Sequence, residues 1–359
     1  MDKYSKSNND IASIKQDFLN QNASHLSNAS KINKIYTSQA KRRFCKTCNS
    51  PISEESGVDF KNHGVDYSIC DVCGHINGLH EDTEVFVNQL YAAESGRNYS
   101  SNYLANYQER VEKIYIPKVD FLYSSLKNED IVLSSDFSIT DFGCGGGHFV
   151  NAATKKGIEA FGIDISKHLI GIAREAYINA FPNAEQPPFQ SNSDERELLN
   201  SLQRCDSTVA SFIGVLEHLK NPNDFIDAYC HSPVKYLYIS VPLFSLSVFI
   251  ENIFTSVFPR QLSGGHTHLY THKSLQWITE KFSLEKVSAW HFGTDAMDLR
   301  RSMICALTEN RVSSKAKDLS SDHCFSSEVI DQVQQVLDRS MCTSESYYNH
   351  GSLHNHILS

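Results

Sequence analysis

The sequence predicts an α/β fold with a doubly wound, largely parallel sheet, joined to a small module built around four cysteines. Two observations lead to this class. From about residue 136 to 310, apolar strand-like segments alternate with helical stretches. Residues 44–80 contain two Cys-x-x-Cys pairs instead. The 359 residues, 40% of them hydrophobic, suffice for about two structural units with one sizeable core.

We divide the chain into five segments, which are residues 1–43, 44–80, 81–125, 126–310 and 311–359. The first is rich in Ser and Asn and should be disordered or partly helical, with a short helix over Asp10–Leu19. The second is the cysteine module. The third is expected to be a helical connector or lid, broken near Pro117. The fourth is the α/β domain, and the fifth is a polar tail with one amphipathic helix containing Val329, Ile330, Val333, Val336 and Leu337.

Within the α/β domain, apolar runs bounded by turn residues predict the strands, and apolar residues at helical spacing predict the helices. The expected strands are Ser138–Phe142, Ala160–Ile165, Thr208–Ile213, Val234–Val241, Glu285–His291 and Ser302–Thr308. The expected helices are Gly147–Lys156, Ser166–Ala180, Pro222–Tyr229 and His272–Phe282. Strands that alternate with crossover helices favour a parallel sheet.

Charge and hydropathy exclude several classes of protein. The formal charge is −9, so general coating of a nucleic-acid backbone is not expected. The first ten residues contain no apolar core typical of a secretory signal. No uncharged apolar run reaches the roughly 18 residues of a membrane span. We therefore expect a cytoplasmic protein.

The most informative segment is Asp141-Phe142-Gly143-Cys144-Gly145-Gly146-Gly147, where an apolar strand runs into three alternate glycines and a helix follows. Glycine permits a sharp turn and the close approach of a ligand. The next predicted strand places Asp164 at its carboxyl edge, where a carboxylate can accept both hydroxyls of a ribose. The acidic residue at the head of the motif favours an amino-acid-like ligand over the pyrophosphate of a dinucleotide. The sequence therefore predicts a nucleoside site at this edge.

This segment resembles the cofactor motif of class I S-adenosyl-L-methionine-dependent methyltransferases. Leu216-Glu217-His218-Leu219 with Pro222, and His268-Leu269-Tyr270-Thr271, resemble two later motifs of that family and occur in the same order. The resemblance covers roughly residues 136–310 and implies a Rossmann-like, seven-stranded sheet. It also implies that Gly143, Gly145 and Gly147 line the cofactor, that Asp141 faces its amino group, and that Asp164 binds its ribose. Asp194 is assigned to the adenine, with a solvated surface charge as the alternative.

Cys45, Cys48, Cys70 and Cys73 form two pairs separated by 21 residues. This spacing is typical of a structural zinc site with four thiolate ligands and no open position. A module of this size can hardly fold on its own core, so Zn²⁺ should supply much of its stability. An iron centre or a redox pair is the alternative. His63 and His75 are interpreted as ordinary loop histidines.

The combination of module and domain leaves more than one function open. It resembles the nucleotide-sugar C-methyltransferases, which also place a four-cysteine ribbon before the methyltransferase domain and follow it with a Tyr-rich segment like Leu90–Ser100. Their catalytic Glu-His-x-x-Tyr-like stretch is matched only partly by Thr267–Tyr270, because the glutamate is absent. One alternative is an RNA methyltransferase docking through the ribbon and the basic residues Lys41, Arg42, Arg43 and Lys46. Another is a non-catalytic, cofactor-binding scaffold.

Methyl transfer to a hydroxyl or an enolisable carbon needs a base, and histidine suits that task. We expect His268 to be this base, with Tyr270, His218 and Glu217 in the same cleft; a structural role in a loop or turn is the alternative for each.

Residues 246–258 form an apolar stripe, which we expect to be a cap over the sheet, with a homodimer interface or a lipid contact as alternatives. The sequence thus predicts a methyltransferase acting on a small polar acceptor, foremost a nucleotide-linked or surface-polysaccharide sugar, at oxygen or carbon.

Overall fold

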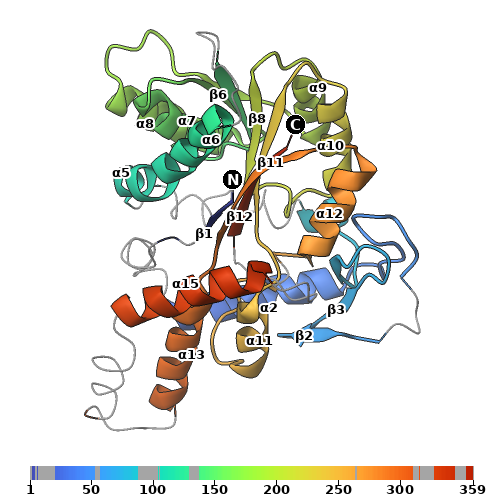
Figure 1. Cartoon of the computed structure of the whole chain (residues 1–359). Helices are drawn as coiled ribbons and strands as arrows, with labels where there is room; N and C mark the ends of the chain where they lie inside the picture. The colour runs from blue at the N-terminus through green and yellow to red at the C-terminus, as the bar shows by residue number, and fades with distance from the viewer. Residues whose placement is uncertain are drawn as a thin grey trace.

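The computed structural model describes residues 2–4, 6, 21–52, 57–87, 104, 106–128, 137–262, 265–309, 315, 327–343 and 353–358. Its centre is an eight-stranded sheet with the order β1-β11-β12-β9-β8-β5-β6-β7 (Figure 1). Five neighbouring strands are parallel: β9 (Tyr236–Val241), β8 (Val209–Ile213), β5 (Ser138–Phe142), β6 (Glu159–Asp164) and β7 (Phe189–Ser191). Their carboxyl ends therefore meet at one edge of the sheet.

Helices cover both faces of this sheet, as a doubly wound fold requires. On one face lie α6 (Ile116–Asn128), α7 (His148–Lys155) and α8 (Lys167–Ala180), and on the other α9 (Glu195–Gln203), α10 (Pro222–Cys230) and α12 (His272–Lys281) (Figure 1). Each face buries its own apolar cluster, one including Leu122, Phe149 and Ile170, the other Leu202, Phe225 and Ile278. The predicted alternation of strands and helices is confirmed here to within two residues at most ends.

The far edge of the sheet differs from the prediction. The expected count of seven strands is not confirmed, because the described residues form eight. The predicted strand Ser302–Thr308 is wrong: these residues lie in helix α13 (Asp295–Glu309). Their place is taken by β12 (Leu353–Leu358), which is antiparallel to both β9 and β11 (Lys286–Phe292). The two-residue strand β1 (Lys3–Tyr4) pairs with β11. A short apolar run does not distinguish a strand from a buried helix segment.

Most described residues of the connector are helical, and Pro117 does not break the helix. The short helices α3 (Glu84–Val87) and α5 (Tyr107–Arg110) are followed by one turn of π-helix, η3 (Val111–Tyr115), which continues into α6. Pro117 is the second residue of α6. Inside a helix a proline lacks the N–H and its ring crowds the carbonyl four residues earlier. The π-turn that ends at Tyr115 already departs from the α-helical hydrogen-bond pattern at this point, so the helix continues past Pro117.

The cysteine module forms a second, four-stranded sheet with the order β10-β4-β3-β2. The module supplies β2 (Phe60–Asn62), β3 (Val65–Ile69) and β4 (Ile76–Gly78), whereas β10 (His268–Leu269) comes from the α/β domain. Helix α2 (Asn22–Thr37) contacts β3 and buries Tyr36 completely. This helix lies in the segment expected to be disordered or partly helical, and the predicted helix Asp10–Leu19 lies outside the described residues.

The apolar stripe at 246–258 begins with helix α11 (Leu246–Ile253), whose buried side chains pack on the module and not over the large sheet. Val248 joins Phe244, Leu262, Tyr67 and Tyr36 in one cluster. Ile253 remains 72% exposed.

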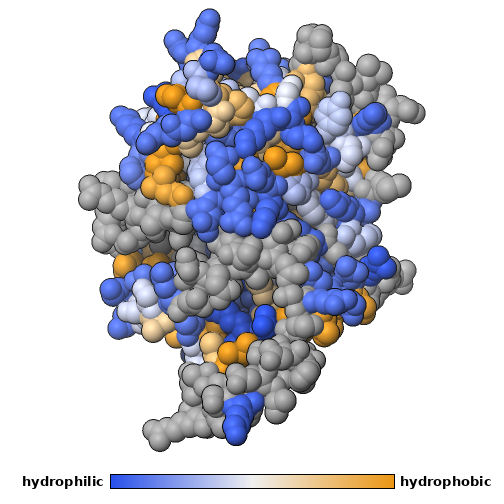
Figure 2. All heavy atoms as spheres, turned by 90° about the vertical axis from the view of Figure 1, so that its left-hand side faces the viewer, coloured by the Kyte–Doolittle hydropathy of each residue, from blue (hydrophilic) through white to orange (hydrophobic). Residues whose placement is uncertain are grey.

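On the face shown in Figure 2, apolar side chains of the described residues lie in separate small groups among hydrophilic ones. Helix α15 (Ser327–Thr343), at the position of the predicted amphipathic helix, contacts α13. None of the described helices has the length and apolar character needed to cross a membrane.

Candidate active site

The glycine turn connects the carboxyl end of β5 to the start of α7. Gly143, Gly145 and Gly147 all have positive φ angles, of 73°, 52° and 76°, which side chains disfavour. A Cβ on Gly143 would come within 2.6 Å of Val215, and one on Gly147 within 2.7 Å of Phe189. At these two positions glycine is thus required by the protein's own packing as well as by the turn.

Asp164, at the end of β6, holds the glycine turn directly. Its Oδ2 accepts the N–H of Gly145 at 2.8 Å, and its Oδ1 accepts the N–H of Ser166 at 2.7 Å. The side chain is buried, and this burial raises the pKa of the carboxyl, while the backbone N–H groups oppose the rise. The glycine turn and Asp164, which the sequence predicts to share one nucleoside site, are therefore in contact.

Asp141, on β5, lies deeper under the same turn. Its Oδ1 accepts a hydrogen bond from Ser211 of β8 at 2.7 Å. Burial raises the pKa of Asp141 to about 7, and the Ser211 hydroxyl and the Lys118 charge oppose that rise. Lys118, on α6, is itself buried and donates to Ser240 of β9 at 2.8 Å. Sequence reasoning missed Lys118, because nothing in the pattern around Pro117 marks a lysine that points into the core.

Asp194 has a capping role in the structure. Its Oδ1 accepts the N–H of Glu197 at 2.9 Å and so caps α9, and its side chain is exposed. The segment that leads to it passes close to the turn, because the Asn192 N–H donates to the Asp164 carbonyl at 2.9 Å. Ile165, which follows Asp164, is 42% exposed and offers an apolar surface beside the carboxylate.

The turn after β8 carries Glu217 and His218. Glu217 is buried, and burial raises its pKa to about 8. Its Oε1 lies 4.0 Å from Nε2 of His218, whose pKa is lowered to about 3 by burial and by the nearby His266. Burial therefore favours the protonated carboxyl of Glu217 and the neutral imidazole of His218.

His268 and Tyr270 approach the same region from β10 and the residues that follow it. Both side chains are buried, with their ring centroids 5.3 Å apart. Burial, together with the charges of Lys46 and Arg42, holds the pKa of His268 well below its usual value. Among the described residues, His268 Nε2, Tyr270 Oη and Glu217 Oε2 are buried without a hydrogen-bond partner. Unsatisfied polar atoms of this kind cost roughly 1–3 kcal/mol each, so such a cluster is typical of a site that meets a polar ligand.

One neighbour of His268 comes from the cysteine module. Nε2 of His75 lies 2.8 Å from Nδ1 of His268, and the His75 side chain is completely buried. His75 does lie in a loop and outside the cysteine cluster, as predicted, but its complete burial and this contact distinguish it from an ordinary loop histidine. Its partner follows 193 residues later in the chain, and no local pattern could have indicated the contact.

The four cysteine sulfurs converge as a metal site requires. All lie within 4.8 Å of one another; Cys45 and Cys73 are 3.6 Å apart and Cys48 and Cys70 3.4 Å apart. A tetrahedron of Zn–S bonds of about 2.3 Å has edges of about 3.8 Å, so the four thiols fit Zn²⁺ with little adjustment. Asn77 donates to Cys45 from outside the cluster, as groups around metal ligands commonly do.

The basic residues beside the module are not a free patch. Lys46 forms an ion pair with Asp82, and Arg42 pairs with the same carboxylate at 3.2 Å. The Lys46 and Arg42 side chains are only 3% and 6% exposed. Two of the four cations that an RNA could have used are thus buried inside the module.

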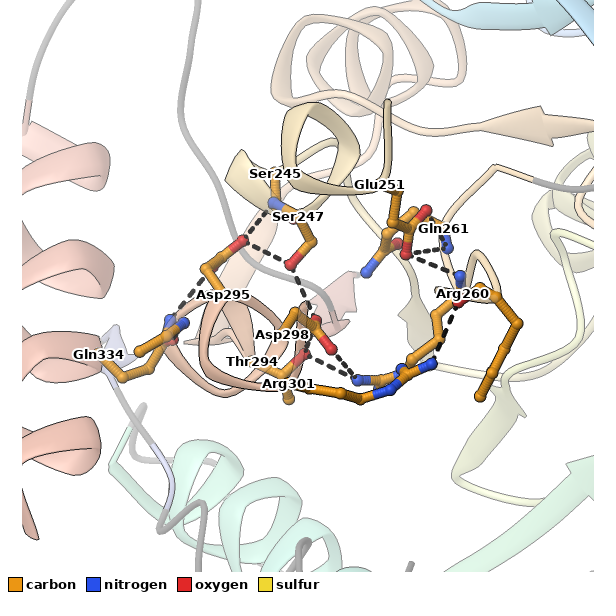
Figure 3. A network of polar contacts seen from close by, with 12 residues as sticks. Ser245, Ser247, Glu251, Arg260, Gln261, Thr294, Asp295, Asp298, Arg301 and Gln334 are labelled. Carbon is orange, nitrogen blue, oxygen red and sulfur yellow. Dashed lines mark hydrogen bonds and ion pairs between the residues drawn. The ribbon is translucent and has the colours of Figure 1, made fainter. Parts of the chain in front are cut away.

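A second polar network holds Arg260 and Gln261 against helices α11 and α13 (Figure 3). Glu251 of α11 accepts the backbone N–H groups of Arg260 and Gln261, and Arg260 pairs with Asp298 of α13 at 2.7 Å. The Gln261 carbonyl in turn accepts from His266 Nδ1 at 3.1 Å. Arg301, also on α13, stacks on the ring of Phe258 at the side of this network.

Comparison with known proteins matches residues 107–289, just over half of the chain, to the methyltransferase domain family. The chain is 30% identical over 90 residues to the ubiquinone biosynthesis O-methyltransferase of Azoarcus sp. (strain BH72); the match covers 25% of this chain and 36% of that relative, little more than a third of its length. Among solved structures, the chain is similar to magnesium protoporphyrin IX methyltransferase from Synechocystis PCC 6803 with bound SAH (17% identity, 57% and 90% coverage, TM-score 0.43). It is also similar to a SAM-dependent methyltransferase from Archaeoglobus fulgidus (18% identity, 67% and 93% coverage, TM-score 0.36).

The family match includes the glycine turn, Asp164 and the turn that carries Glu217 and His218, and so covers most of the site built above. The chain belongs to the methyltransferase domain family.

Proposed function

We propose that the protein transfers a methyl group from S-adenosyl-L-methionine to a small polar acceptor, foremost a nucleotide-linked or surface-polysaccharide sugar. The observation that carries the proposal is the contact between Asp164 and Gly145 at the carboxyl edge of the sheet. It joins a carboxylate to a glycine turn at the strand ends where open α/β sheets bind nucleosides.

The hydrogen-bonding capacity of Asp164 fits a ribose. A carboxylate has about four acceptor positions, and backbone N–H groups use two of them here, one on each oxygen. The Ile165 N–H also faces this carboxylate, and the acceptor capacity that remains would serve the ribose hydroxyls. The exposed face of Ile165 would lie against the adenine, Asp141 would face the cofactor's amino group, and Asp194 would lie near the adenine edge.

The bound cofactor would supply an electrophilic methyl group, so the protein's own task is to align the acceptor and to remove its proton. His268 is the candidate base: it is neutral, and its Nε2 has no partner among the described residues. Glu217 and Tyr270 would hydrogen-bond the acceptor, and their unpartnered oxygens favour a ligand with several hydroxyls. Zn²⁺ would have a structural role, because four cysteines leave no open coordination position.

RNA as the acceptor is less well supported, since Arg42 and Lys46 are committed to Asp82. A non-catalytic scaffold would leave the unpartnered polar cluster unexplained.

The proposal can be tested by incubating purified protein with S-adenosyl-L-methionine and a panel of nucleotide sugars and measuring the product masses by mass spectrometry. We expect one sugar to gain the mass of a methyl group, and His268→Ala to abolish the gain while keeping cofactor affinity. Methylation of RNA fragments in place of every sugar, or full turnover by His268→Ala, would contradict the proposal.

A further inference from the structure

We propose that His75, from the four-cysteine module, is a positioning residue that fixes the ring orientation and the tautomer of His268. The inference rests on the proposed function, in which His268 is the base, and makes the module part of the active site. It assigns a role to a residue that lies outside the part of the chain matched to the methyltransferase domain family.

The geometry leaves the two rings little freedom. The His75 Nε2 to His268 Nδ1 distance is 2.8 Å, and both side chains are 0% exposed. Tyr270 packs edge-on against both, with ring centroids 5.0 Å from His75 and 5.3 Å from His268. A rotation of the His268 ring would break the hydrogen bond in a place that water does not reach, so the bond should hold the ring in one orientation.

The shared hydrogen bond allows two tautomer arrangements, and the proposed base role of His268 selects one of them. A neutral imidazole has one N–H, so one ring must donate and the other accept. A base needs an unprotonated nitrogen toward the acceptor. His268 must then carry its proton on Nδ1 and donate it to Nε2 of His75, which leaves the lone pair on its own Nε2. That atom is buried and has no hydrogen-bond partner among the residues that the structure describes.

The module holds His75 from the other side. The His75 carbonyl accepts from the Cys70 N–H at 2.8 Å and from Asn77 Nδ2 at 3.1 Å, and the same amide group donates to Cys45 Sγ at 3.4 Å. Strand β4 then pairs with β10, where Asn77 lies opposite His268. These contacts connect the cysteine cluster to His75 and His75 to His268. The position of His75 therefore depends on the folded cysteine cluster.

Two variants separate the hydrogen bond from mere packing. His75→Gln keeps an amide oxygen near the position of the ring Nε2, which can accept from His268 Nδ1. His75→Phe keeps the ring volume beside Tyr270 but removes the acceptor. Zinc content and affinity for S-adenosylhomocysteine, measured first, should equal those of the wild type in both variants, because the hydrogen bond between residue 75 and Cys70 uses only backbone atoms, which both substitutions keep.

The deciding measurement is ¹H–¹⁵N NMR of histidine side chains in the full-length protein, with the His268 signals assigned through His268→Asn. We expect only the Nδ1-protonated tautomer in the wild type and in His75→Gln, and loss of this single-tautomer pattern in His75→Phe. An Nε2-protonated His268 in the wild type, or an unchanged pattern in His75→Phe, would overturn the inference. Failure of the proposed function is distinct, since it would show as absent cofactor binding with the tautomer pattern intact.

Discussion

His75 and His268 share a 2.8 Å hydrogen bond although 193 residues separate them along the chain. The bond crosses the boundary between the cysteine module and the α/β domain. The pairing of β4 with β10 and the hydrogen bond from Thr271 Oγ1 to the Gly74 carbonyl, at 3.0 Å, join the same two units. The module is therefore packed into the α/β domain as one of the walls around His268.

We expect about one zinc ion per chain, and loss of both metal and folding stability in Cys73→Ser. Binding of a structural zinc contributes about 10 kcal/mol or more to the folding of small modules, so removing one thiolate should lower the melting temperature substantially. Elemental analysis and differential scanning calorimetry measure the two effects. Cys230→Ser is the control, because this exposed cysteine lies outside the cluster. A metal-free wild type that melts like the zinc-loaded protein would refute the metal site.

Asp82→Asn should destabilise the protein by about 3–5 kcal/mol, because it leaves the buried Lys46 ammonium without its partner. Asp120→Asn should cost less than about 1 kcal/mol, since the Asp120–Lys156 pair is roughly half exposed at each end. Urea unfolding of the two variants measures the difference. Equal effects would mean that the Lys46–Asp82 pair contributes no more than a surface pair.

Gly147→Ala and Gly171→Ala should change the free energy of unfolding in opposite directions. The first places a side chain at a φ of +76° and within 2.7 Å of Phe189, so we expect a loss of at least about 1–2 kcal/mol. The second adds a methyl group to α8 with nothing within 4 Å, and should stabilise the helix by up to about 1 kcal/mol. Thermal unfolding distinguishes the two cases, and a neutral Gly147→Ala would show that the turn is more adaptable than described.

Folding stability should fall as the pH rises from 6.5 to 8. Glu217 and Glu251 have folded pKa values raised to about 8, and Asp141 to about 7, so the folded state binds protons that the unfolded state has already released. Each such proton lowers the free energy of unfolding by up to about 1.4 kcal/mol per pH unit. Below pH 6.5 two histidines oppose this trend. The folded state lowers the pKa values of His268 and His218, so the unfolded state binds protons that the folded state does not, and their contribution to stability falls as the pH falls.

Glu217→Gln tests the pH effect, because it removes one ionisable group and keeps the shape. The slope of stability against pH between 6.5 and 8 should become shallower in this variant. An identical slope would show that Glu217 does not retain its proton in the folded protein.

Much of the α/β core could be predicted because its signals are local. The run into the glycine turn, the strand ending at Asp164 and the helix after Ser166 each depend on neighbouring residues, and the structure places all three as expected. The four-cysteine metal site could be predicted in the same way, because the ligands of such sites occur as closely spaced pairs in the sequence.

The errors concern contacts between distant segments. Ser302–Thr308 contains enough apolar residues for a strand, but in the structure it forms part of α13, whose Asp295 and Asp298 bind the start of α11. The strand that lies between β9 and β11 is β12, from the polar tail, and its pairing depends on partners about 60 and 115 residues earlier in the chain. His75 and Lys118 show the same limit, because each acquires its role only through the tertiary fold.

The central claim is that the glycine turn and Asp164 together bind a nucleoside cofactor, and isothermal titration calorimetry with S-adenosylhomocysteine tests it most directly. We expect the wild type and Asp227→Asn, a surface change on α10, to bind one equivalent per chain with equal affinity. Asp164→Asn should bind at least tenfold more weakly, the equivalent of about 1.4 kcal/mol. No binding to the wild type, or equal affinity in Asp164→Asn, would contradict the claim.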